Sequence, residues 1–97
     1  MIRRRATDDG DVVMVTFSVP ADLHEQVYVV GDFNQWESPG LILESDGDGM
    51  REVTVALRSP GAYAFRYRAG DGRWFNDESA DDYQPNEFGG CNGIVSI

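Results

Sequence analysis

Residues 27–36 read Val-Tyr-Val-Val-Gly-Asp-Phe-Asn-Gln-Trp, and this stretch decides how the rest of the chain is arranged. Its apolar first half predicts a strand that ends at Gly31, where a turn begins, with Phe33 as a core ring just beyond it. Residues 34–40 are otherwise polar or turn-forming, so they cannot build a core around the indole of Trp36. The pattern therefore predicts an exposed indole on a loop, a surface that suits stacking against a flat, partly apolar ligand.

A second tryptophan, Trp74, stands in another turn, which reads Asp-Gly-Arg-Trp at residues 71–74. We expect the folded scaffold to bring the two indoles to one surface. A pyranose ring presents C–H groups on its face and hydroxyls at its rim, and an indole covers such a face at little entropic cost. Two indoles set at an angle are therefore expected to select a curved, α-linked sugar chain.

Alternation of apolar and polar residues predicts strands along most of the chain. The expected strands and short apolar runs cover residues 12–19, 27–30, 41–43, 53–57, 63–67, 73–75 and 93–97. About six or seven short strands separated by Gly, Pro and Asp turns predict an all-β antiparallel sandwich over residues 12–97. Residues 1–11 are expected to form a flexible polar arm, and residues 76–92 are expected to form a loop.

The chain has 97 residues and a formal net charge of −9, with 17 acidic residues against 8 basic ones. A surface this acidic repels phosphate backbones and anionic headgroups, so neither nucleic acid nor a membrane surface is an expected partner. No stretch approaches the roughly 18 apolar residues of a transmembrane helix. Cys91 is the single cysteine, so no internal disulfide is possible, and we expect a cytoplasmic protein.

Signals for catalysis and for metal binding are weak. Cys91 and His24 could form a nucleophile and base, but no orienting motif accompanies them. The acidic residues cluster in turns, where a solvated surface is the ordinary explanation. Residues 46–49 read Asp-Gly-Asp-Gly, which begins like a calcium loop but lacks its later ligands and indicates a hairpin turn. We therefore expect no catalytic residues, no metal and no cofactor.

Four fragments of the sequence, in this order, resemble a known family. They are Gly-Asp-Phe-Asn-x-Trp at 31–36, Pro-Gly-x-Tyr-x-Phe-Arg-Tyr at 60–67, Asp-Gly-x-Trp at 71–74 and Phe-Gly-x-x-Asn at 88–92. Together they resemble carbohydrate-binding module family 48, the isoamylase N-terminal-like early-set domains. This family includes the glycogen-binding domain of the AMP-activated protein kinase β subunit. The resemblance covers about residues 10–97 and implies an immunoglobulin-like, early-set β-sandwich.

The resemblance also implies a set of sugar-binding residues. In glycan-binding members, two tryptophans stack on glucose, a basic residue and an asparagine bond hydroxyls, and an apolar side chain inserts against the glucan helix. Carried over by motif, these residues are Trp36, Trp74, Arg66, Asn92 and Phe88. The chain departs from the pattern in three ways: Gly90 replaces a common Thr, Arg66 replaces a common Lys, and the hairpin from Arg66 to Trp74 is one residue longer.

Each of these residues also has a structural explanation. Either tryptophan could belong to the core, because Trp74 precedes Phe75 and one of two consecutive strand residues faces inward. Arg66 could be a solvated sheet residue, Asn92 could cap a turn, and Phe88 could be a core plug.

Two functions follow from the sequence. The first is a non-catalytic module that binds an α-1,4-linked glucan, either alone or beside a separately encoded glycan-active enzyme. The second is an early-set interaction domain that has no sugar site and docks a protein partner. The sequence leaves the oligomeric state open. It also predicts that Val55→Asp unfolds the domain, whereas Trp36→Ala leaves the melting temperature nearly unchanged.

Overall fold

The computed structural model describes residues 1–22, 25–87 and 89–97. His24 and Phe88, which the sequence analysis singled out, lie outside the described residues. The elements are β1 (Ile2–Ala6), β2 (Val12–Pro20), β3 (Val27–Gly31), η1 (Asp32–Asn34), β4 (Leu41–Ile42), β5 (Glu44–Ser45), β6 (Met50–Arg58), β7 (Ala62–Ala69), β8 (Trp74–Phe75), β9 (Asp82–Pro85) and β10 (Cys91–Ser96). Apart from the single 3₁₀ turn η1, all of these elements are strands.

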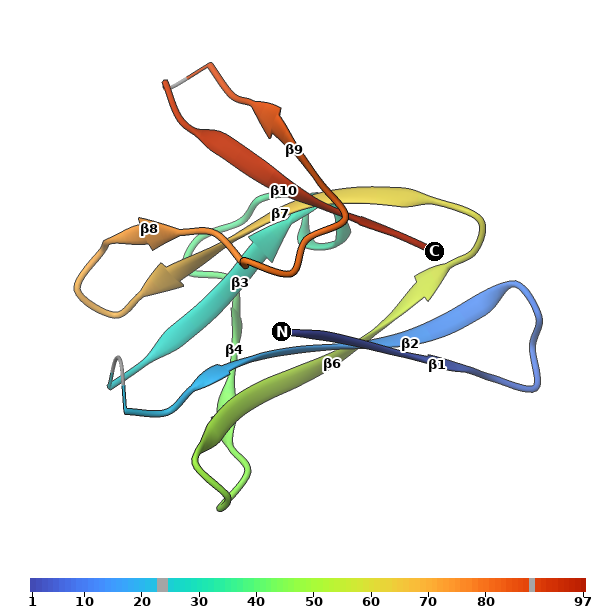
Figure 1. Cartoon of the computed structure of the whole chain (residues 1–97), viewed down its shortest axis with the longest axis horizontal. Coiled ribbons are helices and arrows are strands. Elements are labelled where there is room, and N and C mark those ends of the chain that lie inside the picture. Colours follow the sequence, from blue (N-terminus) through green and yellow to red (C-terminus); the bar gives the residue numbers. More distant parts are fainter. Residues whose placement is uncertain (23–24, 88) are drawn as a thin grey trace.

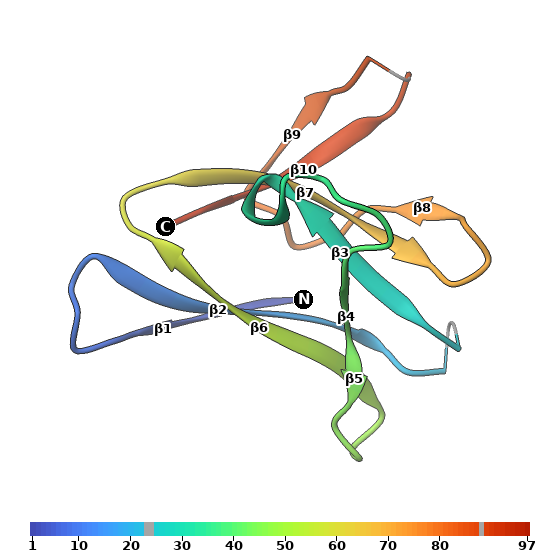
Figure 2. The same ribbon diagram turned by 180° about the vertical axis from the view of Figure 1, so that it is seen from behind.

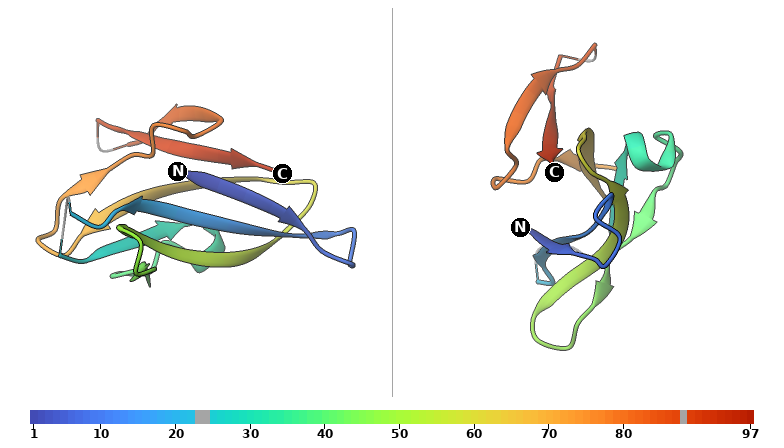
Figure 3. Two further views of the ribbon diagram at one scale, coloured as in Figure 1. Left: turned by 60° about the horizontal axis from the view of Figure 1, so that its bottom comes forward. Right: turned by 90° about the vertical axis from the view of Figure 1, so that its right-hand side faces the viewer.

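The strands form two antiparallel sheets that pack as a sandwich (Figure 1). The four-stranded sheet has the order β1-β2-β6-β5. The six-stranded sheet has the order β4-β3-β7-β10-β9, with β8 paired to β7 beside this path. Figure 3 shows the N-terminal strand β1 beside the C-terminal strand β10, where Arg4 donates to the Ser96 carbonyl at 3.2 Å. The prediction of an all-β, immunoglobulin-like antiparallel sandwich is confirmed.

The core lies between the sheets and is built from the residues that alternate along each strand. Phe17 of β2 lies at its centre, with its ring centroid 4.9 Å from that of Phe65 and 5.5 Å from that of Phe33. The fully buried side chains are Val15, Phe17, Val27, Val29, Val30, Leu43, Phe65, Tyr67 and Val95. On the outer face of the four-stranded sheet, Thr16 and Thr54 form a hydroxyl hydrogen bond of 2.7 Å across β2 and β6. Along β2 and β6, apolar side chains that face the core thus alternate with hydroxyl side chains that face outward, which is the alternation predicted from the sequence.

The N-terminal segment is a strand, which corrects the flexible arm expected over residues 1–11. β1 pairs with β2 from Ile2 opposite Phe17 to Ala6 opposite Val13. Its arginines extend the pairing: Arg3 donates to Glu52 at 2.7 Å, and Arg4 donates to Asp81. Four of the five residues of β1 are exposed, so backbone pairing and ion pairs hold this strand. Such a strand leaves no apolar period in the sequence.

The loop expected over residues 76–92 also contains a strand, β9, which pairs with β10. All four of its residues are exposed, so the sequence carries no alternation there. Within the described residues, no helix is long and apolar enough to cross a membrane.

One acidic side chain is buried where the two sheets meet. Asp77 is 4 % exposed and accepts hydrogen bonds from the Tyr67 hydroxyl and the Met1 amino group, each 2.6 Å long. The backbone N–H of Ser79 donates to its other oxygen at 2.7 Å. Burial, together with the hydrogen bond and negative charge of Asp77, raises the pKa of Tyr67 far above its ordinary value. Tyr67 therefore remains a neutral donor to Asp77.

Candidate functional site

The turn after β3 is shaped by close contact with β7. A Cβ atom at Gly31 would lie 2.5 Å from the Ala64 carbonyl oxygen, so only glycine fits where the two backbones meet. The chain then makes the 3₁₀ turn η1, and the Asn34 side chain accepts a hydrogen bond from the Gly31 N–H at 2.9 Å. The Trp36 N–H donates back to the Gly31 carbonyl at 3.0 Å. These bonds close residues 31–36 into a compact loop.

Asp32 fixes the direction of the Trp36 indole. One oxygen of its carboxylate accepts from the indole Nε1–H at 2.9 Å, and the other accepts from the backbone N–H of Ala64 at 2.8 Å. Trp36 has a φ of 56°, a left-handed conformation that is unusual for a bulky residue. The indole is nevertheless 37 % exposed. Because its N–H is already engaged, this indole presents its ring surface to a ligand.

Trp74 reaches the surface by strand alternation. On the short strand β8, Trp74 lies opposite Arg68, and Phe75 lies opposite Tyr67. Phe75 faces the core, with its ring centroid 5.2 Å from that of Tyr67. Trp74 therefore faces outward, and it is 44 % exposed. The two tryptophans are solvent-facing residues of the structure, and neither is sealed in the core.

Arg66 lies on β7 and points to the same outer face of the six-stranded sheet. Its guanidinium carbon is 5.8 Å from the centroid of the Trp74 ring, within the range of a cation–π contact. Its Nε–H donates to the side-chain oxygen of Asn76 at 3.2 Å. Since Nε is engaged, the terminal nitrogens are the further hydrogen-bond donors that Arg66 brings to the surface beside the Trp74 ring.

Asn92 lies on β10 and is oriented by another asparagine. The Asn86 side chain donates from Nδ2 to the Asn92 Oδ1 at 3.3 Å, and its own Oδ1 accepts from the Gly90 N–H at 3.0 Å. Asn86 thereby ties the β9–β10 turn to the Asn92 side chain. Because the Asn92 oxygen accepts from Asn86, its Nδ2 hydrogens are the groups left to meet a ligand.

These side chains line one surface hollow of about 700 Å³. Its lining consists of Trp36, Arg66, Trp74, Asn86, Glu87 and Asn92. Four of the five predicted site residues thus come together from four separate parts of the chain. The fifth, Phe88, lies outside the described residues. Sequence reasoning missed Asn86 and Glu87, although both adjoin the predicted segment 88–92, because residues 76–92 were treated as an undifferentiated polar loop.

The hollow offers both hydrogen-bond donors and an acceptor. Arg66 and Asn92 supply donors, and the exposed carboxylate of Glu87 can only accept. Gly90 lies at the wall, where an added Cβ would be 3.5 Å from both Arg66 Nη1 and Asn86 Nδ2, an ordinary contact distance. Within the described residues, no three His, Cys, Asp or Glu side chains are grouped so that they could hold a metal ion.

Comparison with known proteins adds no relative to this description. No protein-family model matches the chain, and a search of curated proteins finds no match.

Proposed function

We propose that this domain is a non-catalytic module that binds an α-1,4-linked glucan through the hollow between Trp36 and Trp74. The observation that carries the proposal is the convergence of the two exposed indoles with Arg66 and Asn92 on one hollow. The resemblance of the sequence to carbohydrate-binding module family 48 supports the same reading. In this proposal, the indoles cover the apolar faces of glucose rings.

The hydrogen-bonding groups of the hollow suit the rim of a sugar. Each hydroxyl can donate one hydrogen bond and accept others, so a sugar needs both kinds of partner. Arg66 and Asn92 donate to hydroxyl oxygens, whereas Glu87 accepts from a hydroxyl. Surface modules of this kind bind weakly, with a Kd on the order of micromolar to millimolar.

Titration with maltoheptaose and β-cyclodextrin tests the proposal, with tryptophan fluorescence and amide chemical shifts as readouts. We expect saturable shifts, and we expect cellohexaose, which is β-linked, to give none in the same range. Trp36→Ala and Trp74→Ala should each weaken binding about 5- to 150-fold, since a stacked aromatic contributes about 1–3 kcal/mol in comparable flat-ring sites.

Two matched controls identify the hollow as the binding site. Ile42→Ala removes an equally exposed apolar side chain elsewhere and should leave the titration unchanged. Glu78→Ala should do the same, whereas Glu87→Ala, which removes the acceptor of the hollow, should weaken binding. Titration to about 10 mM detects even a complex with a Kd above about 1 mM, whose binding free energy is weaker than about −4 kcal/mol. A flat titration of the wild type over this range would overturn the proposal.

The second candidate is an interaction domain that has no sugar site. The observation that favours it is the open edge of strand β6, which pairs with β5 only at Arg51 and Glu52.

A further inference from the structure

Strand β6 has one edge that is only partly covered. It pairs with β2 from Met50 to Arg58, but its other edge pairs with β5 only at Arg51 and Glu52. Across the described part of the chain no other strand pairs with β6, and Figure 2 shows β5 beside only its lower end. The edge is therefore open at Thr54 and Ala56.

The backbone groups on this edge can be assigned from the strand geometry. The Asp46 N–H donates to the Met50 carbonyl at 2.9 Å, so the backbone groups of Met50 point toward β5. Direction alternates along a strand, and Thr54, Ala56 and Arg58 therefore point the same way. The Arg58 carbonyl accepts from the Tyr63 hydroxyl at 2.8 Å. Thr54 and Ala56 each present an N–H and a carbonyl to a new strand.

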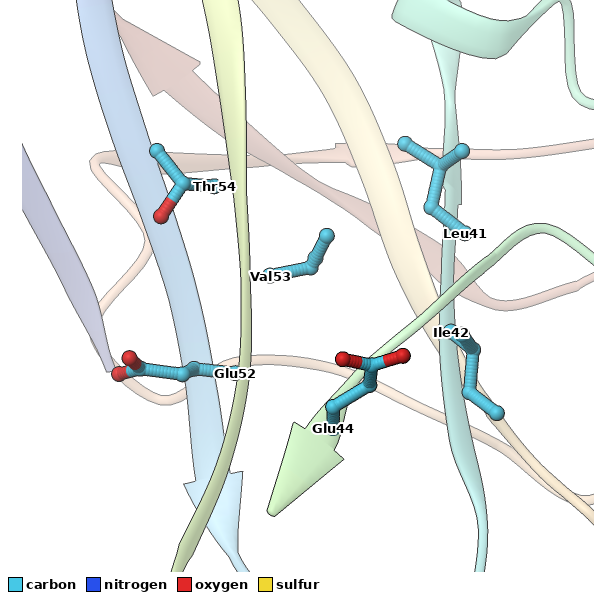
Figure 4. A pocket seen from close by; sticks show the side chains of 6 residues that line it. All are labelled: Leu41, Ile42, Glu44, Glu52, Val53 and Thr54. Carbon is cyan, nitrogen blue, oxygen red and sulfur yellow. The ribbon is translucent and has the colours of Figure 1, made fainter. Parts of the chain in front are cut away.

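A hollow of about 450 Å³ lies where the covered part of this edge meets the open part. Its lining consists of Leu41, Ile42, Glu44, Glu52, Val53 and Thr54 (Figure 4). Figure 4 shows the Glu44 carboxylate between Val53 and Ile42, while Glu52 points away toward the side where it pairs with Arg3. An apolar hollow that contains a carboxylate suits a long cationic side chain, whose methylenes and charged end match it.

Arg58 stands at the end of β6, whereas Arg51 and Glu52 stand near its start, where Glu44 of β5 lies opposite Glu52. We propose that the open edge of β6 pairs with the same edge of a second copy of this chain. Antiparallel pairing brings Arg58 of each strand toward Glu44 beside the start of the other strand, whereas parallel pairing would bring the two Arg58 side chains together. The two four-stranded sheets would then form one continuous sheet across a two-fold axis.

The open positions fix the register of this pairing. Glu44 already lies opposite Glu52, so the added strand can begin only at Thr54. Thr54 then lies opposite Arg58 of the second copy, whose carbonyl also accepts from the Tyr63 hydroxyl, and Ala56 lies on the axis opposite its own equivalent. Arg58 of the second copy then adjoins the hollow that holds Glu44, whereas Glu52, its diagonal neighbour, keeps its ion pair with Arg3. Both ends of the interface contain this contact.

Analytical ultracentrifugation of the whole chain tests the proposal. The experiment uses about 0.15 M salt, where the Debye length is about 8 Å. At this salt concentration the long-range repulsion between two chains of net charge −9 is largely screened, whereas ion pairs in direct contact are screened less. We expect the average mass to rise toward that of a dimer as the concentration approaches about 1 mM, a range that detects weak association. Trp36→Ala should dimerise like the wild type, which separates this surface from the proposed sugar site.

Two variants probe the edge in different ways. Ala56→Pro removes an N–H that faces solvent in the monomer, a position where an edge strand accepts proline, and it should abolish the dimer. Arg58→Glu should lower the association constant about tenfold or more, because it places like charges together. Arg5→Glu, which makes the same change of charge on the exposed strand β1, should leave association unchanged.

The charge pair itself is tested by exchange. Combining Arg58→Glu with Glu44→Arg should restore association relative to Arg58→Glu alone. Amide chemical shifts of Thr54 and Ala56 should move with wild-type concentration, a readout that needs no variant. A wild type that remains monomeric to about 1 mM, or a dimer that Ala56→Pro and Arg58→Glu leave intact, would overturn the proposal.

Discussion

Asp32 is the residue on which the position of the Trp36 indole depends. One of its oxygens holds the indole N–H, and the other holds the backbone of Ala64 on β7. The ring is thus tied to the rigid six-stranded sheet, although its own backbone belongs to a loop. A ring held in this way loses little freedom when it stacks on a ligand, which favours binding.

At the same scale, the left-handed backbone of Trp36 predicts an unusual order of stabilities. Trp36→Ala should lower the free energy of unfolding by only about 1 kcal/mol, because the side chain is partly exposed and makes one hydrogen bond. Trp36→Gly should be more stable than Trp36→Ala by about 1 kcal/mol, since glycine adopts a φ of 56° without strain. Urea denaturation of both variants measures the difference. Alanine more stable than glycine would contradict the geometry.

At the scale of the element, strand β8 shows how a two-residue strand assigns two aromatic rings to opposite faces. Its pairing with β7 places Phe75 beside Tyr67 in the core and Trp74 beside Arg68 outside. The sequence left open which ring was buried. Pairing register decides the matter, because a shift of one residue would exchange the two faces.

Strands β2 and β6, at the centre of the four-stranded sheet, should differ in how much stability they lose when a charged residue replaces a core valine. Val15 on β2 is fully buried, whereas Val55, directly opposite on β6, is only partly buried beside the open edge. Val15→Asp should cost more than about 4 kcal/mol and unfold most of the population, while Val55→Asp should cost about 2–3 kcal/mol. The latter is a smaller effect than the unfolding expected from sequence alone. Circular dichroism with urea melts compares them, and equal losses would contradict the difference in burial.

The sequence predicted those elements in which apolar residues alternate. Strands such as β2 and β7 carry this pattern. The exposed tryptophan loop was predicted for a different reason, because its polar neighbours could not bury an indole. Strands β1 and β9 were missed because most of their residues are exposed and backbone pairing, with ion pairs at β1, holds them, which leaves no hydrophobic period. Asn86 was missed for a related reason: its role is to orient Asn92 across the β9–β10 turn, and that contact exists only after folding.

At the scale of the whole molecule, Asp77 connects parts of the chain that are distant in sequence. It accepts from Tyr67 of the six-stranded sheet and from Met1, which adjoins the first strand of the other sheet. A buried carboxylate with several donors is stabilised, but it becomes costly if a donor is removed. Tyr67→Phe should therefore cost about 1–3 kcal/mol at neutral pH.

The same pair predicts how stability depends on alkaline pH. The pKa of Tyr67 is raised in the folded state, whereas in the unfolded chain its ordinary pKa is about 10. The Tyr67 contribution is fully present below about pH 10 and falls by about 1.4 kcal/mol per pH unit above it, because only the unfolded state then loses the proton. Urea melts from pH 8 to about pH 11.5 should show this decline in the wild type and a shallower one in Tyr67→Phe. Parallel curves would contradict it.

If the proposed sugar site is correct, Gly90 is a position from which its affinity can be adjusted. Its backbone is outside the left-handed range, and the atoms nearest to a side chain there would be Arg66 Nη1 and the Asn86 amide, at ordinary contact distances. A hydroxyl or a longer group could therefore be introduced without disturbing the scaffold. Selection or design could retune such a module for a different oligosaccharide with one substitution, while the sheets that carry it remain as they are.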